Sequence, residues 1–108
     1  MKEIRAYIQP FMLPKLTQIL IEIPNFPGMS VSDCEGFGRE KLLQRQDYTL
    51  YAPRKRVEIF APDEMVEDIF NAIMATANTH QQGAGKVYII DAEKGGYICT
   101  GEQGEELA

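Results

Sequence analysis

The chain has 108 residues, of which 44% are hydrophobic and 25% charged, a composition typical of one globular domain with room for a core. Its formal net charge is −5, which argues against general nucleic-acid binding because a phosphate backbone requires a basic face. No apolar run approaches the roughly 18 residues that cross a membrane. Cys34 and Cys99 lack the spacing of a metal or redox pair. We therefore expect a cytoplasmic protein that is not inserted in a membrane and has two reduced thiols.

The first half of the chain predicts a strand, a helix and a second strand. Residues 4–8 alternate apolar and polar side chains, as a half-buried strand does. A helix opens after Pro10, and Pro14 fits there because the first turn needs no N–H donor. The apolar face of this helix consists of Leu13, Leu16, Ile19, Leu20 and Ile23. Residues 24–28 end the helix, residues 29–35 form the second predicted strand, and residues 40–52 are a polar segment.

The second half predicts another strand, helix and strand. A basic cluster at 54–56 leads into a strand at 57–61. The next helix begins at 62–64, because proline and acidic residues suit the positive end of a helix. Its apolar stripe, which is typical of a helix face that packs on a core, consists of Met65, Val66, Ile69, Phe70, Ile73, Met74 and Ala77. A strand at 87–91 follows, then a short extended piece at 95–100 and a polar tail at 101–108.

This order of elements predicts an α+β fold of the ferredoxin-like βαββαβ type. Such a fold has one antiparallel sheet with both helices on one face. The other face of the sheet is left uncovered and carries apolar residues here, so we expect a closed oligomer that buries it. No repeat or linker divides the chain, and residues 1–108 are therefore one domain.

The glycine turn at residues 79–86 precedes the last long strand. Gly83 and Gly85 lack Cβ, so their backbone can take positive φ and approach a ligand closely. Amide groups that point into one concavity bind anions, and Lys86 adds a positive charge at its edge. The turn is therefore a candidate phosphate cradle. A simple connection between helix and strand is the alternative interpretation of this pattern taken alone.

Short motifs occur along most of the chain. They are M-K-x-I at 1–4, I-x-P-F at 8–11, G-M-S-V at 28–31, G-F-G-R at 36–39, R-V-E-I at 56–59, T-A-x-T-x-x-x-G-x-G-K-V at 76–87 and T-G-E at 100–102. Together they resemble the PII signal-transduction proteins, the trimeric regulators of nitrogen and carbon metabolism. The most specific part of the resemblance is G-F-G-R followed by G-x-G-K.

The resemblance implies a homotrimer that binds an adenine nucleotide (ADP, AMP or ATP) in the clefts between subunits, with Mg²⁺ as a further possible ligand. Residues 79–86 match the B-loop of the family, residues 40–52 its T-loop and residues 97–108 its C-terminal loop and tail. The nucleotide-binding residues implied in this way are Ser30, Gly36, Phe37, Gly38, Arg39, Glu58, Gly83, Ala84, Gly85, Lys86 and Cys99. For Glu58, a solvated strand glutamate is an equally open interpretation.

The chain departs from the family around the second effector. Glu40 replaces a glutamine that usually helps to hold magnesium and 2-oxoglutarate; a carboxylate can bind Mg²⁺ but repels an anion. Arg54 replaces a lysine that usually meets 2-oxoglutarate, and Gln9 replaces another lysine. The candidate effector residues are therefore Glu40, Arg54 and Arg56, with Glu40 also the candidate metal ligand. Whether 2-oxoglutarate, bicarbonate or neither binds stays open.

Two further departures concern modification and nucleotide preference. The T-loop is about five residues shorter than usual, and Tyr48 and Tyr51 lie outside the usual context of the modified tyrosine. Tyr97 and Cys99 replace two arginines that usually reach the triphosphate. Without those cations we expect ADP or AMP to bind at least as well as ATP.

The resemblance implies a regulator that signals through its T-loop to a membrane transporter or a metabolic enzyme. One alternative is a CutA-type trimeric protein that binds a divalent metal, or a PII-like regulator associated with metal efflux. For this the single His80 with scattered cysteines is a poor signature. The other alternative is an enzyme, but the sequence shows no catalytic grouping, so at most a weak nucleotide hydrolysis is expected.

Overall fold

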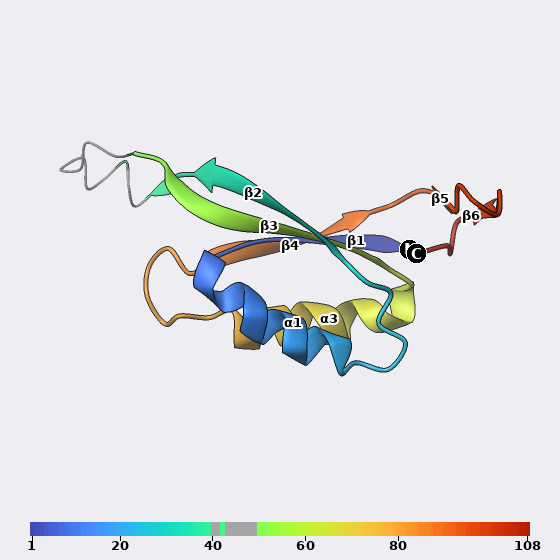
Figure 1. The fold of residues 1–108 in the computed structure, drawn as a ribbon, viewed down its shortest axis with the longest axis horizontal. Coiled ribbons are helices and arrows are strands. Elements are labelled where there is room, and N and C mark those ends of the chain that lie inside the picture. The colour runs from blue at the N-terminus through green and yellow to red at the C-terminus, as the bar shows by residue number, and fades with distance from the viewer. Residues whose placement is uncertain (40–41, 43–49) are drawn as a thin grey trace.

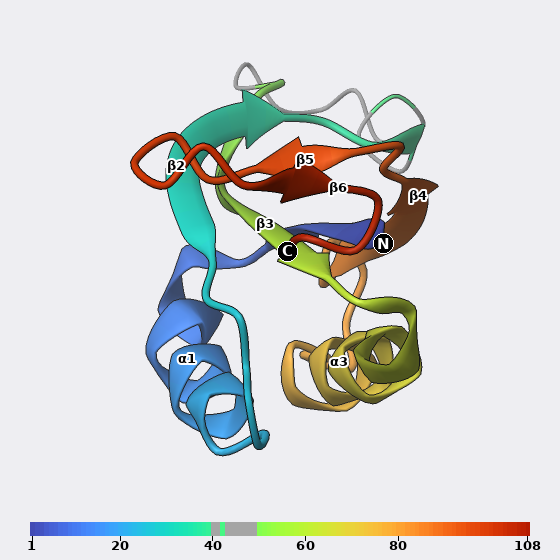
Figure 2. The same ribbon diagram turned by 90° about the vertical axis from the view of Figure 1, so that its right-hand side faces the viewer.

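Strand β1 (Lys2–Ile8) lies inside a four-stranded antiparallel sheet with the order β2-β3-β1-β4. Its neighbours are β3 (Ala52–Ala61) and β4 (Gly85–Asp91), and β2 (Ser30–Gly36) pairs with the outer side of β3. The computed structural model describes residues 1–39, 42 and 50–108. Helices α1 (Leu13–Ile21) and α3 (Asp63–Thr76) lie side by side against one face of the sheet (Figures 1 and 2). The predicted α+β, ferredoxin-like fold is confirmed.

The core lies between the sheet and the two helices. Side chains alternate across a strand, so every second residue of β1 and β3 faces the helices. The fully or almost fully buried members of the core are Ile4, Ala6, Ile8, Leu16, Leu20, Val57, Ile59, Ala61, Val66, Ile69, Ile73 and Ala77. Each buried leucine or isoleucine contributes about 1.5–3 kcal/mol of hydrophobic free energy, so this layer supplies most of the stability of the fold.

Both helices show a narrower apolar stripe than the sequence predicts. A short 3-10 helix (Pro10–Met12) precedes α1, and α1 ends at Ile21 rather than continuing to residue 23. The side chain of Ile19 is 38% exposed and that of Met74 is 55% exposed. The prediction that Met74 packs on the core was therefore wrong, and Ile19, expected on the apolar face of α1, lies at an exposed position of that face.

Strand β3 begins five residues before the predicted 57–61. Its first half pairs with β2, in a register that places Gly36 opposite Ala52 and Cys34 opposite Arg54. Lys55 of this half forms an ion pair with Asp33 across the two strands. The apolar alternation starts only at Val57 because the helices cover the sheet only from there onwards. The basic cluster thus lies within the strand and not before it.

The C-terminal tail forms a small hairpin instead of an extended piece and a polar tail. Strands β5 (Gly95–Gly96) and β6 (Gln103–Gly104) pair with each other in a separate two-stranded sheet. Gly95 permits this fold-back, because a Cβ there would lie 2.3 Å from the carbonyl oxygen of Leu107. The hairpin projects from the end of the molecule opposite to the end where β2 finishes and β3 begins (Figure 1). Within the described part of the chain, no helix is long and apolar enough to cross a membrane.

Candidate anion-binding site

The glycine turn connects α3 to β4 and runs through several residues with positive φ. His80 has φ 60°, Gly83 85° and Gly85 126°. At Gly85 the reason is packing within the sheet, because a Cβ would lie only 2.0 Å from the carbonyl oxygen of Tyr7 on β1. The fold itself therefore requires glycine at residue 85, with or without a ligand. At Gly83 a Cβ would instead lie 3.3 Å from Arg54 Nη2.

Hydrogen bonds hold this turn in place. The carbonyl of Gly83 accepts one bond from Gln9 Nε2 at 2.8 Å and another from Arg54 Nη2 at 3.3 Å. Within the turn, the Ala84 amide donates to the carbonyl of Gln81 at 3.3 Å. The turn is therefore attached both to the end of β1 and to the beginning of β3. Gln9 was absent from the predicted site, and no sequence signal marks it, because 74 positions separate it from Gly83.

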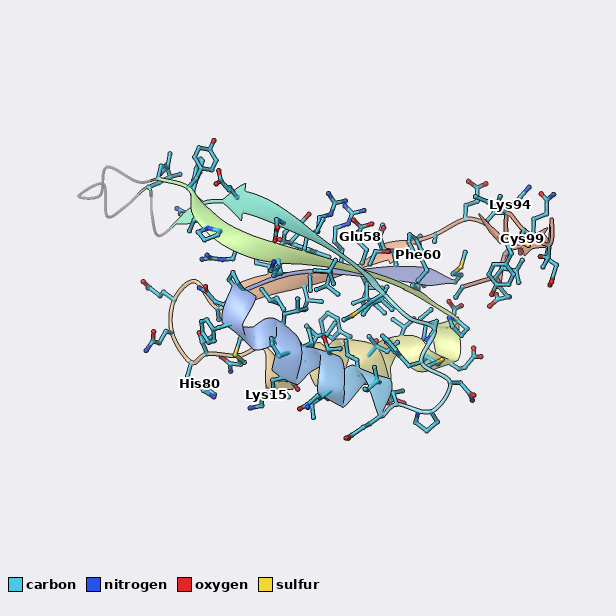
Figure 3. The ribbon with its side chains drawn as sticks, viewed as in Figure 1. Lys15, Glu58, Phe60, His80, Lys94 and Cys99 are labelled. Carbon is cyan, nitrogen blue, oxygen red and sulfur yellow. The ribbon has the colours of Figure 1, made fainter. Side chains whose placement is uncertain are left out.

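The sheet face turned away from the helices is called the open face below. Figure 3 shows Glu58 and Phe60 on this side of β3, whereas Lys15 lies beyond the helix on the other side. Strand alternation and the observed registers define the other members of the open face. They are Glu3, Arg5, Tyr7, Ser30, Ser32, Cys34, Arg54, Arg56, Lys86, Tyr88 and Ile90.

The end of the open face nearest the glycine turn is basic. Arg56 lies opposite Tyr7 and Tyr7 opposite Lys86, so the two cations are two strands apart, about 10 Å. Arg54 lies on the same face, two residues before Arg56. Lys86 is exposed and makes no ion pair with a described residue. In a chain of net charge −5, this local excess of positive charge favours binding of an anion.

Further along the same face the charges are paired. Arg5 Nη2 lies 2.9 Å from Glu3 Oε1, and Arg56 Nε lies 2.8 Å from Glu58 Oε1. The Arg56 Nε–H is buried and has no well-aligned acceptor among the described residues, so this second contact is an ion pair by distance rather than a good hydrogen bond. Glu58 is thus a partly buried, ion-paired residue rather than a freely solvated one.

The predicted residues around the T-loop base are only partly described. Gly36 pairs with Ala52, and beyond them Phe37 packs edge-to-face on Tyr51 with ring centroids 5.0 Å apart. Gly38 and Arg39 follow, and Arg39 is exposed. The predictions that concern Glu40 and Tyr48 lie outside the described residues. In the remainder, no group of three or more histidine, cysteine, aspartate or glutamate side chains is placed to hold a metal ion.

The structure does not bring all the predicted nucleotide-binding residues together. Ser30 and Glu58 lie opposite each other on β2 and β3, about 20 Å along the strand from Gly36. Cys99 lies in the C-terminal hairpin, and Figure 3 shows it at the end of the molecule opposite to His80 of the glycine turn. The longest dimension of the chain is 52 Å. One subunit therefore cannot place Cys99 and the glycine turn against the same ligand.

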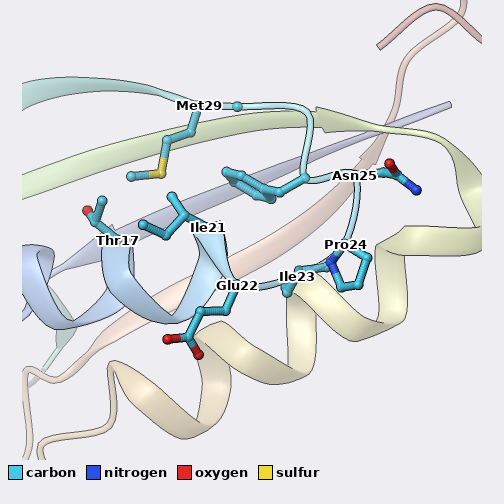
Figure 4. Close-up of a pocket in the computed structure, with 9 residues that line it drawn as sticks. Thr17, Ile21, Glu22, Ile23, Pro24, Asn25 and Met29 are labelled. Atoms are coloured by element: carbon cyan, nitrogen blue, oxygen red, sulfur yellow. The ribbon is translucent and has the colours of Figure 1, made fainter.

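A hollow in the described part of the surface lies elsewhere. It has a volume of about 570 Å³ and lies between the end of α1 and the loop that leads to β2 (Figure 4). Its lining is mostly apolar, with Ile21, Phe26 and Met29 among its walls. At the basic end of the open face, by contrast, Lys86 is exposed while Arg54 and Arg56 are partly buried.

A small α+β protein with two helices on one face of an antiparallel sheet and the other face uncovered has the architecture of the ferredoxin-like class. Comparison with known proteins identifies the family. The family described as nitrogen regulatory protein P-II matches residues 1–102, and the chain belongs to this family. The members it matches are regulatory proteins and not enzymes.

Several relatives match almost end to end. A nitrogen regulatory protein P-II of Haemophilus influenzae is 35% identical over 111 residues, which cover 98% of each chain. That of Pasteurella multocida is 37% identical over the same length and coverage. Nitrogen regulatory protein P-II 1 of Escherichia coli K12 is 35% identical over 108 residues, or 95% of this chain and 96% of the relative. The resemblance inferred from the motifs is thereby confirmed.

Proposed function

We propose that this protein is a cytoplasmic P-II sensor that binds an adenine nucleotide with its phosphates against the glycine turn. The observation that supports this most directly is the exposed Lys86 at the end of that turn, on the basic end of the open face. Phosphate oxygens carry concentrated negative charge and pair strongly with such a cation. Backbone amides of a glycine-rich turn add donors at close range.

The proposed binding unit is a homotrimer with the nucleotide between subunits. Phe60 and Tyr88 of the open face are 43% and 48% exposed in the single chain, which is apolar surface that a partner would cover. The edge strands β2 and β4 are each paired on one side only. A neighbouring copy also supplies the only means by which Cys99 can approach a glycine turn.

The proposed preference is for ADP or AMP at least as strong as for ATP. Tyr97 and Cys99 of the C-terminal hairpin carry no positive charge, and no arginine occurs beyond Arg56. Between residues 57 and 108, only Lys86 and Lys94 carry a full positive charge. A third phosphate therefore gains less electrostatic stabilisation than it would from two added arginines. Mg²⁺ can accompany the phosphates, with Glu40 as its candidate ligand.

The proposed output is a change in the T-loop, residues 40–52, that regulates a membrane transporter or a metabolic enzyme. The T-loop leaves β2 and returns into β3, and β3 carries Arg54 and Arg56. A second small anion such as bicarbonate or 2-oxoglutarate would bind to these two arginines. Any ligand that favours one T-loop conformation shifts its population by the difference in affinity for the two states.

Calorimetric titration of the purified protein with ATP, ADP and AMP, each with and without Mg²⁺, tests this proposal. Lys86→Ala removes a charge-assisted hydrogen bond of about 1.5–3 kcal/mol, so we expect ADP affinity to fall roughly tenfold to a hundredfold. Lys15→Ala, on the outer side of α1 (Figure 3), is the matched control. Absence of nucleotide binding, or unchanged affinity in Lys86→Ala, contradicts the proposal.

Three further measurements separate the alternatives. Light scattering after size exclusion gives the oligomeric state, and a monomer contradicts the intersubunit site. Release of inorganic phosphate from ATP measures hydrolysis, for which we expect no turnover above background. Titration with divalent cations in the absence of nucleotide tests the CutA-type interpretation, which requires tight metal binding without any nucleotide.

A further inference from the structure

The carbonyl oxygen of Gly83 is held by two side chains from different strands. Gln9, directly after β1, donates from Nε2 at 2.8 Å, and Arg54, near the start of β3, donates from Nη2 at 3.3 Å. The other terminal nitrogen of Arg54 donates to the carbonyl of Pro53 at 2.8 Å. The guanidinium thus spans the distance from its own strand to the glycine turn.

The chemistry of these groups suits this arrangement. A carbonyl oxygen has two lone pairs and can accept both bonds. The guanidinium presents its N–H groups in a rigid plane, so little side-chain freedom is lost when it spans two acceptors. Glycine suits residue 83 because its φ is 85°, and an added Cβ would also lie within a tight 3.3 Å of Arg54 Nη2.

Holding this carbonyl determines the orientation of the next amide. The peptide group is planar, so once the Gly83 carbonyl points at Gln9 and Arg54, the Ala84 N–H points the opposite way. That N–H donates to the carbonyl of Gln81 and closes the turn. The two side chains therefore set the conformation of the turn at the point where the proposed cradle needs its amides in place.

We infer that Gln9 and Arg54 are positioning residues that hold the glycine turn in its ligand-binding conformation and connect it to the beginning of β3. This inference rests on the proposed function and adds a structural link between the two halves of the site. Gln9 needs no contact with the nucleotide for this role. Arg54 lies on β3, the strand that follows the T-loop. A conformational change of the glycine turn is therefore transmitted to β3 through this single side chain.

Backbone NMR relaxation of the unliganded protein is the first test. We expect the amides of Gly83 and Ala84 to show order parameters near 0.85 in the native chain and to fall toward 0.6 in Gln9→Leu and in Arg54→Gln. Gln9→Glu is a nearly isosteric variant whose carboxylate cannot donate to a carbonyl, and it should have the same effect. Gln18→Leu and Gln18→Glu, at an exposed position of α1, are the matched controls.

Binding of ADP is the second test. Gln9→Leu changes no charge, and we expect it to weaken ADP binding about five- to tenfold, the loss typical of one hydrogen bond. If native protein binds no ADP, the proposed function fails while the order parameters still decide the role of the two side chains. If order parameters and ADP affinity are unchanged in Gln9→Leu and Gln9→Glu while Lys86→Ala weakens binding, the inference is overturned and the proposed function stands.

Discussion

Replacing Gly85 by alanine is the sharpest test of how the glycine turn joins the sheet. Gly85 is the first residue of β4 and lies opposite Ile8 of β1. Residues with a side chain rarely adopt its φ of 126°, and the added Cβ would lie 2.0 Å from the carbonyl oxygen of Tyr7. The neighbouring atom is backbone within a paired strand, so it cannot swing aside as a flexible side chain would.

The expected cost has two parts. The backbone conformation alone costs an alanine roughly 1–3 kcal/mol. Relief of the overlap requires the Ile8–Gly85 end of the β1–β4 ladder to open, which loses at least one or two hydrogen bonds of about 1 kcal/mol each. The sum is about 3 kcal/mol or more, out of roughly 5–15 kcal/mol for a typical domain. For about 100 residues this lowers Tm by at least roughly 12 °C.

Two other glycines serve as graded controls. Gly28 has φ 105° but open space around its Cβ position, so Gly28→Ala measures the backbone cost alone. Gly104 has open space and an ordinary φ, so Gly104→Ala should change Tm very little. Thermal and urea unfolding are measured at one protein concentration, because assembly makes Tm depend on concentration. A Tm for Gly85→Ala within 3 °C of that for Gly28→Ala would refute the argument from close packing.

Three further experiments test other parts of the fold. The hydrogen bond and charge of Lys2 hold the pKa of Asp91 below its usual value. This pair therefore stabilises the folded protein at pH values above the pKa that Asp91 has in the unfolded chain. The stabilisation is lost as the pH falls through the lower pKa of the folded protein. In an NMR titration, Lys2→Ala should raise the pKa of Asp91. Ile59→Ala should lower the free energy of unfolding by about 2–5 kcal/mol in urea. A double-mutant cycle on Phe37 and Tyr51 should give a coupling of about 0.5–1.5 kcal/mol.

The fold was predictable because its core follows simple periodicities. Apolar alternation in β1 and the second half of β3, and the 3.6-residue pattern of both helices, mark the residues that pack together. The first half of β3 and the C-terminal hairpin carry no such pattern, because neither packs against the helices. The pairing of these strands depends on backbone hydrogen bonds, and almost any exposed side chain is compatible with such pairing. This explains why the sequence does not predict their bounds.

The site was predictable at the level of motifs but not of geometry. Lys86 and Arg56 were identified individually, yet the register that places both opposite Tyr7 is a property of the sheet. The glycine turn was recognised as a turn, whereas the reason for Gly85 is a carbonyl 78 positions earlier in the chain, at Tyr7. In the sequence, Gln9 is visible only as the loss of a lysine, because a neutral amide shows no pattern until its partner is known.

The separation of Cys99 from the glycine turn has a thermodynamic consequence for the proposed sensor. If the ligand contacts the turn of one subunit and the C-terminal hairpin of another, the single chain holds only part of the site. The factor by which assembly raises nucleotide affinity then equals the factor by which nucleotide raises the affinity of the subunits for one another. In the proposed trimer, the nucleotide is thus expected to stabilise the assembly as well as to report through it.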